Sequence, residues 1–408
     1  MKLFAIGIMI TASLALFWSS PEDRAAIAPS GEQLVRDAGE LQAALVRARG
    51  GERLRLAPGE YGRLDLYQRR FAQPVVVQGP DGPARAHFDT VRIVESAGIR
   101  MERIEIGSDR PAADGAYARI QESERIELAG VHVHGSRDGN PRNDGLGVHV
   151  DHSSDVTIGG SDLEEVQIGV IIRRSDRVKV VGNHIHTIRS DGVMAAASEQ
   201  LEISGNYISD FLPDPQDHAD GIQLQNVGVN RGTTGVTIAD NVIMQGAGEG
   251  VQGIWISDGE PLRHRDLTIT NNLIYINRMY NGIGLNDLEN ARVVDNTVVS
   301  EPDDEMTAWI RVQNATGVHL ERNISDRLLV QDKVTGMTRT DNMFFVGRAT
   351  PKCLFPRLGA KAAAAPADFV VADIGFQIND RVHPLARTGA QPLARASARK
   401  KCAGQVEN

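Results

Sequence analysis

The chain has only two cysteines among its 408 residues, and both, Cys353 and Cys402, lie near the C-terminal end. A framework of several disulfides is therefore excluded, whereas one bridge that closes the C-terminal region stays open, with two free thiols as the alternative. Aromatic residues make up only 5% of the chain, while glycine occurs 41 times. This composition favours a narrow aliphatic core with many tight turns.

The sequence also lacks an excess of basic residues, since its formal net charge is −9 at pH 7. General affinity for nucleic acid needs a basic surface, so we expect no nucleic-acid partner. An acidic ligand would have to be met by a local group of arginines rather than by the overall field of the protein. We expect the chain to be a monomer.

The N-terminus carries a run of almost wholly apolar residues, 3–18, behind Lys2. The run is too short to be an easy transmembrane helix and is typical of a secretory signal, so we predict a secreted or periplasmic protein. An uncleaved signal would instead anchor the chain in a membrane. We assign residues 1–28 to this signal or anchor.

A repeated phrase of alternating apolar residues that ends in asparagine fills most of the remaining chain. The alternation predicts strands with one buried face, and no helical stretch separates the copies. We therefore predict an all-β solenoid of stacked strands, in which the asparagines form a hydrogen-bonded ladder at an inner turn. The repeated asparagines are Asn183, Asn206, Asn241, Asn272, Asn296 and Asn323.

A helix is predicted ahead of the coils, in residues 37–49, with Leu41, Ala44 and Leu45 on one side. Such a helix would cover the open end of the solenoid, which otherwise exposes unpaired strand edges. The predicted organisation is an N-terminal cap in residues 29–52, coils in 53–350, and a C-terminal cap or loose tail in 351–408.

Glycines set the register of the coils, at Gly147, Gly169, Gly192, Gly221, Gly253 and Gly282. The first and third residues after each glycine are apolar and predicted to point inward, so the second and fourth point outward. The outward rows hold amides, an indole, arginines and a histidine, which is a mixture suited to sugars, although an ordinary solvated face is the alternative. The predicted substrate-binding residues are His149, Gln223, Gln225, Trp255, Asn286 and Arg311, together with Gln252 and Asn281, which directly precede glycines.

Two aspartates, Asp191 and Asp220, directly precede glycines in successive coils. Stacking would place their carboxylates side by side at the edge of the groove, where like charges raise one pKa and provide an acid and a base. The alternative is that Asp-Gly is simply favourable turn chemistry. His218 and Arg189 lie beside these aspartates in sequence, and the loop before Gly221 is longer than a turn requires.

The coil pattern resembles the pectate-lyase-like right-handed parallel β-helix superfamily, which includes polysaccharide lyases, polygalacturonases and alginate C5-epimerases. The resemblance covers most of the chain after the signal and implies a single-stranded right-handed parallel β-helix. The stretch HADGIQL at residues 218–224 is similar to the Asn-Thr-Asp-Gly element of polygalacturonases. This similarity implies a catalytic role for Asp220, although the other polygalacturonase motifs are absent.

These patterns lead to a secreted carbohydrate-active enzyme that acts on an acidic, uronate-containing polysaccharide. As a lyase or C5-epimerase it would use His218 or Asp220 as base, with Arg173 or Arg189 holding the carboxylate of the sugar. As a glycoside hydrolase it would use Asp191 and Asp220. The remaining alternative is a non-catalytic protein of the cell envelope that binds or assembles a polysaccharide.

A second group of residues is predicted in the asparagine phase of three successive coils. Imidazoles and carboxylates alternate there in two columns, which would suit zinc or another transition ion. The alternative is a surface ladder of hydrogen-bonded pairs, and calcium in acidic turns is a further hypothesis. The candidate metal ligands are His132, His134, Asp162, Glu164, His184 and His186.

Overall fold

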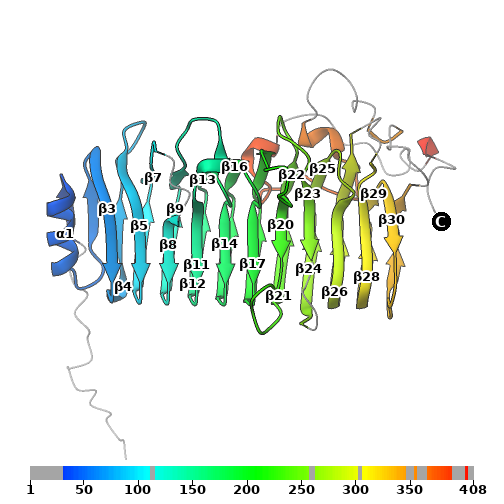
Figure 1. Cartoon of the computed structure of the whole chain (residues 1–408), viewed down its shortest axis with the longest axis horizontal. Coiled ribbons are helices and arrows are strands. Elements are labelled where there is room, and N and C mark those ends of the chain that lie inside the picture. The colour runs from blue at the N-terminus through cyan, green and yellow to red at the C-terminus, as the bar shows by residue number, and fades with distance from the viewer. Residues whose placement is uncertain are drawn as a thin grey trace, which may run out of the picture.

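The structure is a computed structural model that describes residues 31–110, 115–256, 262–301, 306–345, 353–355, 365–387 and 400–402. The chain winds into an elongated solenoid whose coils follow one another in sequence order along the long axis (Figure 1). Strands of successive coils pair in parallel. The predicted signal or anchor, residues 1–28, lies outside the described residues.

Each coil contributes strands to three faces. The first face contains β3 (Gly59–Tyr67), β5 (Ala86–Val94), β8 (Ala116–Gln121), β11 (Leu146–Asp151), β14 (Val170–Arg173), β17 (Val193–Ala196), β20 (Asp220–Leu224), β23 (Gln252–Ile256), the first halves of β26 (Asn281–Val294) and β28 (Trp309–Glu321), and β30 (Arg327–Val330).

The second face contains β1 (Glu32–Val35), β2 (Arg53–Leu56), β4 (Arg70–Gln78), β6 (Ala97–Glu102), β9 (Glu124–Ala129), β12 (Ser154–Gly159), β15 (Asp176–Val181), β18 (Glu199–Ser204), β21 (Thr234–Ala239), β24 (His264–Thr270), the second halves of β26 and β28, and β31 (Thr338–Thr340). The third contains β7 (Glu105–Gly107), β10 (His132–His134), β13 (Asp162–Val166), β16 (His184–Ile188), β19 (Tyr207–Phe211), β22 (Val242–Met244), β25 (Leu273–Ile276), β27 (Thr297–Ser300), β29 (Ile324–Ser325) and β32 (Met343–Phe344).

The core is the column of aliphatic side chains between the three faces. On β20, the first and third residues after the glycine, Ile222 and Leu224, are fully buried, as the sequence predicts. The glycine itself is required by the close approach of the coils. A Cβ atom on Gly221 would lie 2.6 Å from Ile243 Cγ2 and 2.8 Å from the carbonyl oxygen of Gly253.

The predicted asparagine ladder is present and runs from Asn183 to Asn342. In each step, the main-chain N–H and the side-chain amide of one asparagine donate to the Oδ1 of the next; for Asn206 and Asn241 these distances are 3.0 and 2.9 Å. The amide also donates to a carbonyl of a neighbouring coil, as Asn241 does to Ile203 at 2.9 Å. A second ladder, which the sequence analysis did not identify, joins Ser96, Ser123, Ser153, Ser175 and Ser198.

The N-terminal end is covered by α1 (Ala38–Arg47), at the blue end in Figure 1. Asp37 caps this helix by accepting a hydrogen bond from the main chain of Glu40 at 2.8 Å. The predicted side chains Leu41, Ala44 and Leu45 are buried against the coils. The helix therefore shields the end of the core, as expected.

The C-terminal region was predicted to be a loose tail or an end cap, but its described part lies along the side of the solenoid. The segment 375–383, here called the strap, crosses successive coils in reverse order. Gly375 N–H donates to Arg322 O at 2.8 Å, Gln377 N–H donates to Asn271 Oδ1 at 2.6 Å, and Asn379 Nδ2 donates to Asp240 Oδ1 at 2.8 Å.

Apolar residues around the strap pack against the third face and include Phe369, Ile374 and Phe376, which are fully buried. The region also contains short 3₁₀ helices, Pro366–Phe369 and Pro384–Ala386. Cys353 and Cys402 form a disulfide, so the open choice between a bridge and two thiols is resolved in favour of the bridge.

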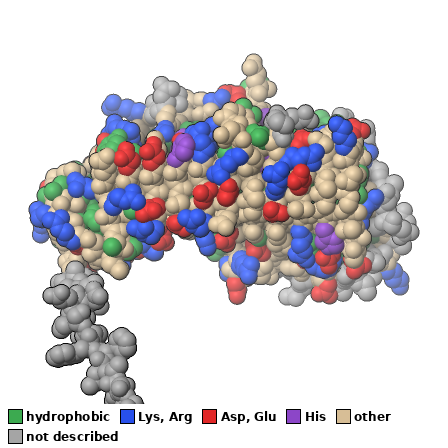
Figure 2. Space-filling view, turned by 90° about the horizontal axis from the view of Figure 1, so that it is seen from below, with side chains coloured by type: hydrophobic (Ala, Val, Ile, Leu, Met, Phe, Trp, Pro, Cys, Tyr) green, Lys and Arg blue, Asp and Glu red, His purple; other side chains and the backbone are tan. Residues whose placement is uncertain are grey.

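Figure 2 shows one face of the molecule, on which basic and acidic side chains are interspersed. Within the described ranges, no helix is long and apolar enough to cross a membrane.

We predict that Asn241→Ala lowers the free energy of unfolding by about 2–4 kcal/mol, because the change leaves buried amide groups of Asn206 without acceptors. Urea denaturation would measure the loss. The matched control is Asn230→Ala in an exposed loop, which should change stability by no more than about 0.5 kcal/mol. Equal stability of the two variants would contradict a stabilising role for the ladder.

Candidate active site

The two predicted catalytic aspartates are neighbours in adjacent coils. Val193 pairs with Ile222, so Asp191 and Asp220, each two residues earlier, are in register. Asp220 N–H donates a hydrogen bond to Asp191 Oδ1 at 3.1 Å. The sequence predicted that both side chains line the edge of an open groove. This is wrong, because Asp191 is 4% exposed and Asp220 is fully buried.

His218 is the member of the group that reaches solvent. Its Nδ1 lies 2.9 Å from Asp220 Oδ2, and 51% of its side chain is exposed. Gln223 Nε2 donates to the same carboxylate oxygen at 2.9 Å. Asp220 Oδ1 is buried and has no hydrogen-bond partner within the described ranges. The buried carboxylate thus fixes the ring of His218, as the aspartate of a catalytic dyad does.

Burial accounts for the charge state of the aspartates. It raises the pKa of Asp220 to about 6, and burial together with the charge of Asp220 raises the pKa of Asp191 well above its usual value. The raised pKa of Asp191 favours its neutral form, which leaves Asp220 as the charged partner of the imidazole. The hydrogen bond to Asp220 in turn raises the pKa of His218 above its ordinary value.

A chain of polar groups continues from His218 across three more coils. Gln252 contacts His218 Nε2, Asn281 Nδ2 donates to Gln252 Oε1 at 2.5 Å, and Trp309 Nε1 donates to Asn281 Oδ1 at 2.8 Å. These residues follow Asp220 in register on β23, β26 and β28. The predicted row of Asp191, Asp220, Gln252 and Asn281 is therefore brought together by stacking.

Aromatic rings border this row. Trp255 lies with its ring centre 5.9 Å from that of His218, and the stacked rings of Tyr280 and Trp309 have centres 4.7 Å apart. Arg311, a predicted sugar-binding residue, lies over Trp255 at 5.8 Å. Tyr280 and Trp309 were missed, although a count of fourteen residues back from Asn323 reaches Trp309.

The loop that carries His218 is held by ion pairs. Arg189 Nε lies 2.6 Å from Asp217 Oδ2 and 3.1 Å from Asp214 Oδ2. Arg142, on the neighbouring loop, also pairs with Asp214 at 3.2 Å. Arg189 therefore has carboxylate partners within the protein and positions the loop, whereas the sequence analysis had assigned it to the carboxylate of a sugar.

Other predicted residues of the first face lie apart from His218. Arg173 pairs with Ala196 in the register, roughly 16 Å along the strand from the position of Asp191. It is therefore too far away to hold the carboxylate of a sugar at His218. His149 pairs with Ile171 of the next coil, and Ile171 pairs with Met194 of the coil after that. Both of these apolar side chains are buried.

The row that contains His149 is therefore not one continuous polar groove. Both ring nitrogens of His149 are buried without a hydrogen-bond partner in the described part of the chain, and burial lowers the pKa of this histidine to about 4. Asn286 is also buried and donates to Ile256 O at 2.8 Å, and Gln225 contacts Met194 Sδ at 2.6 Å. Asn286 and Gln225 are therefore engaged within the fold, and the buried ring nitrogens of His149 do not face an open groove.

The predicted metal columns exist on the third face. His132, Asp162 and His184 are in register, as are His134, Glu164 and His186. The side chains contact one another diagonally as well as along the columns, since His132 Nε2 lies 2.9 Å from Glu164 Oε1 and His186 Nε2 lies 3.3 Å from Asp162 Oδ1. His134 is fully buried, contrary to its predicted outward position.

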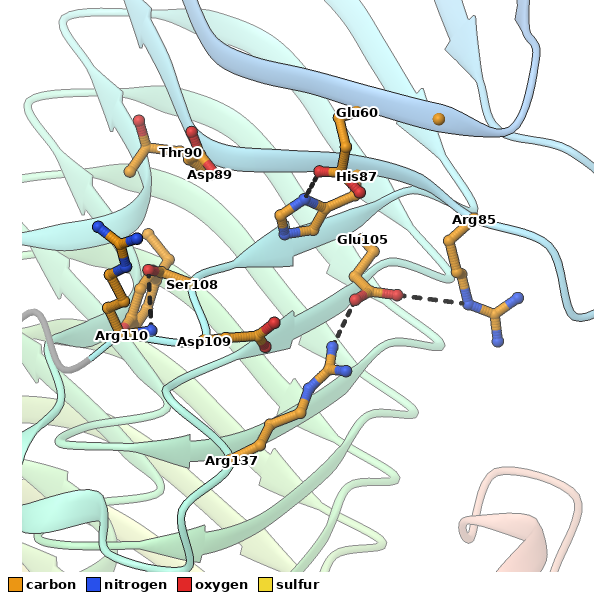
Figure 3. Close-up of a pocket in the computed structure, with 12 residues that line it drawn as sticks. Glu60, Arg85, His87, Asp89, Thr90, Glu105, Ser108, Asp109, Arg110 and Arg137 are labelled. Atoms are coloured by element: carbon orange, nitrogen blue, oxygen red, sulfur yellow. Dashed lines mark hydrogen bonds and ion pairs between the residues drawn. The ribbon is translucent and has the colours of Figure 1, made fainter.

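A pocket of about 770 Å³ lies nearer the N-terminal end, over β3, β5 and β7 (Figure 3). No residue of this pocket was predicted to bind a ligand, because the register of outward side chains was set only for the coils from Gly147 onward. His87 Nδ1 lies 2.5 Å from Glu60, and His134 Nε2 lies 3.2 Å from Glu105. Arg85 and Arg137 both reach Glu105, as the dashed lines show.

The arrangement around His218 can move a proton at a fixed atom. Nδ1 is engaged by Asp220 and Nε2 contacts the side-chain amide of Gln252, so a ligand that exchanges a proton at Nε2 has to displace this amide. The aspartate would stabilise the imidazolium that results. The side-chain amides of Gln252 and Asn281 and the indole of Trp255 supply polar and flat apolar surfaces of the kind that sugars use.

We predict that Asp220→Asn lowers the pKa of His218, because the change removes the carboxylate that favours the imidazolium. An NMR titration of the histidine signals would measure the shift, and His152, which is 51% exposed but pairs with Asp151, serves as an internal reference. An unchanged titration of His218 would show that Asp220 does not set its charge.

Comparison with known proteins supports the fold. A family model described as a right-handed β-helix region matches residues 118–324, and no curated protein sequence matches the chain. A Dettilon tailspike protein is 15% identical with a TM-score of 0.52, covering 81% of this chain and 64% of its own. This similarity concerns the fold and not the activity.

An alginate lyase from Paenibacillus sp. is 16% identical with a TM-score of 0.49, covering 74% of this chain and 99% of its own. The surface adhesin PfbA of Streptococcus pneumoniae is 11% identical with a TM-score of 0.45, covering 79% and 85%. Both identities are too low to transfer an activity. With the parallel coils and the match over half of its length, the chain belongs to the right-handed β-helix family.

Proposed function

We propose that the chain is a carbohydrate-active enzyme that removes a proton from a uronate unit of an acidic polysaccharide. The single observation that carries the proposal is the contact of half-exposed His218 with the buried carboxylate of Asp220 at 2.9 Å. Burying the carboxylate of Asp220 costs free energy, because its charge loses contact with water. A half-exposed histidine does not require such a partner for the stability of the fold, so the contact favours a functional role. The N-terminal apolar run supports export of this enzyme to the periplasm or the exterior.

The proposed reaction starts at C5, next to the carboxylate of the sugar. His218 Nε2 takes the C5 proton, and the electron pair moves into the carboxylate as an enolate. In a lyase, the electron pair then forms the C4–C5 double bond, the C4–O bond breaks, and the departing oxygen takes up the proton from the imidazolium of His218. In an epimerase, C5 instead receives a proton from water on the opposite face, and His218 releases its proton to solvent.

The enolate needs hydrogen-bond donors at the carboxylate of the sugar. Gln252 contacts Nε2 and Asn281 follows in the next coil, and each side-chain amide has a second N–H that is suited to this task. Trp255, Tyr280 and Trp309 offer ring faces for neighbouring sugar units, and Arg311 adds a positive charge beside Trp255. The cations Arg189 and Arg173 are not needed for this arrangement.

The hydrolase alternative is less well supported. A glycosidase needs two carboxyl groups separated by about 5 Å or more, with the sugar between them. Here Asp191 accepts a hydrogen bond from the main chain of Asp220, and both side chains are buried. The exposed group is an imidazole, which fits proton abstraction better than glycosidic hydrolysis by two carboxyl groups.

We predict that purified protein, screened against uronate-containing polymers, forms a product with the ultraviolet absorbance of an unsaturated sugar, or exchanges the C5 proton with solvent deuterium. His218→Asn should lower kcat by about 10²–10⁴-fold, because the proton acceptor is lost. In the wild type, kcat/KM should rise with pH through the pKa of His218, since only the neutral ring accepts a proton.

The matched control is His152→Asn, which changes an equally exposed histidine near the far end of β11 and should leave kcat unchanged. New reducing ends without ultraviolet absorbance or proton exchange would show a hydrolase and contradict the proposal. Polymer binding with no product under any condition, unaffected by His218→Asn, would instead show a non-catalytic binding protein.

A further inference from the structure

A group of imidazoles on the third face has no part in the proposed reaction. Asp162 lies on β13, and His184 and His186 lie on the next strand of this face, β16. Asp162 Oδ1 is 3.0 Å from His184 Nδ1 and 3.3 Å from His186 Nε2. One nitrogen of each ring and the carboxylate oxygen all lie within 4.8 Å of one another.

Two of the distances among these three atoms match those between the ligands of one metal ion. Zinc bonds of about 2.0–2.1 Å in a tetrahedral set place neighbouring ligand atoms roughly 3.3 Å apart. The two imidazoles, whose ring centres are 4.1 Å apart, converge on the same carboxylate oxygen. His186 also lies 3.8 Å from Glu164 Oε2, but its shorter contact is to the Asp162 oxygen that it shares with His184.

The strap brings a fourth imidazole next to His184, outside the group of three ligand atoms. The ring centre of His383 lies 6.0 Å from that of His184, and its Nδ1 accepts a hydrogen bond from Leu385 N–H. Nε2 is therefore the ring nitrogen that is left for a metal.

The comparable group around Glu105 lacks this character. Glu105 is within 4.8 Å of ligand atoms of His87 and His134, but Arg85 and Arg137 also pair with it (Figure 3). Two guanidinium groups already balance this carboxylate and would repel a cation. Asp162, in contrast, forms ion pairs only with His184 and His186 among the described residues.

We propose that a divalent transition-metal ion of the zinc class binds to Asp162, His184 and His186, with His383 of the strap as the fourth ligand. The mixture of imidazole and carboxylate favours zinc over calcium, which takes oxygen ligands. Because the ligands come from two coils and from the strap, the ion ties the C-terminal segment to the middle of the solenoid. The site is separate from His218. It gives a role to the histidine columns, which take no part in the proposed reaction.

The test is titration of the purified, chelator-treated full chain with zinc against a chromophoric chelator. We expect one equivalent to bind and to raise the melting temperature. His184→Ala and His186→Ala should each weaken binding by at least tenfold, and Asp162→Asn should also weaken it. Thermal melting of each variant without metal separates loss of a ligand from loss of the fold.

The matched control is His132→Ala, a histidine of the same face whose partner is Glu164, and this variant should bind zinc like the wild type. No stoichiometric binding, or binding unaffected by the changes at His184 and His186, would overturn the site. His383→Ala should weaken binding severalfold and abolish part of the metal-dependent rise in melting temperature. Wild-type affinity in that variant would remove His383 from the ligand set.

Discussion

Parallel hydrogen bonding between successive coils is the constraint on which the rest of the structure depends. It fixes the repeat along the axis, so residues of equal phase become neighbours although many positions separate them in the chain. Asn206 and Asn241 are 35 positions apart, and Asn323 and Asn342 are 19 apart. The asparagine ladder keeps the same spacing between coils at a turn, where strand pairing cannot fix it. Because each coil contacts mainly the next, a side chain at a given phase has its environment set by two adjacent coils.

This spacing explains how an otherwise costly site is maintained. Two buried aspartates in adjacent coils destabilise the charged state of the pair, and the rigid stack prevents them from moving apart. Each carboxyl group has a hydrogen-bond partner. Asp191 accepts a hydrogen bond from the main-chain N–H of Asp220, and the side chain of Asp220 contacts His218. The group that reaches solvent is then the imidazole, and the carboxylate of Asp220 contacts it from the buried side.

The C-terminal region adds a second kind of connection. The coils interact only with their neighbours, whereas the strap contacts Arg322, Asn271 and Asp240 within five residues of its own chain. It ends against the ring of His184. A segment that crosses the coils in this way couples parts of a solenoid that would otherwise be independent, and the proposed ion lies at its far end.

The sequence by itself determined the solenoid, its register, the capping helix and the asparagine ladder, because each of these follows from local periodicity. It also placed Asp191 beside Asp220 and His132 beside Asp162, since equal phase means adjacency in stacked coils. The tertiary structure alone decided which of these groups are buried and which reach solvent. It removed Arg173, His149 and Asn286 from the site, gave Arg189 partners in the loop, and brought His383 to His184, because loops and straps follow long-range packing that no repeat encodes.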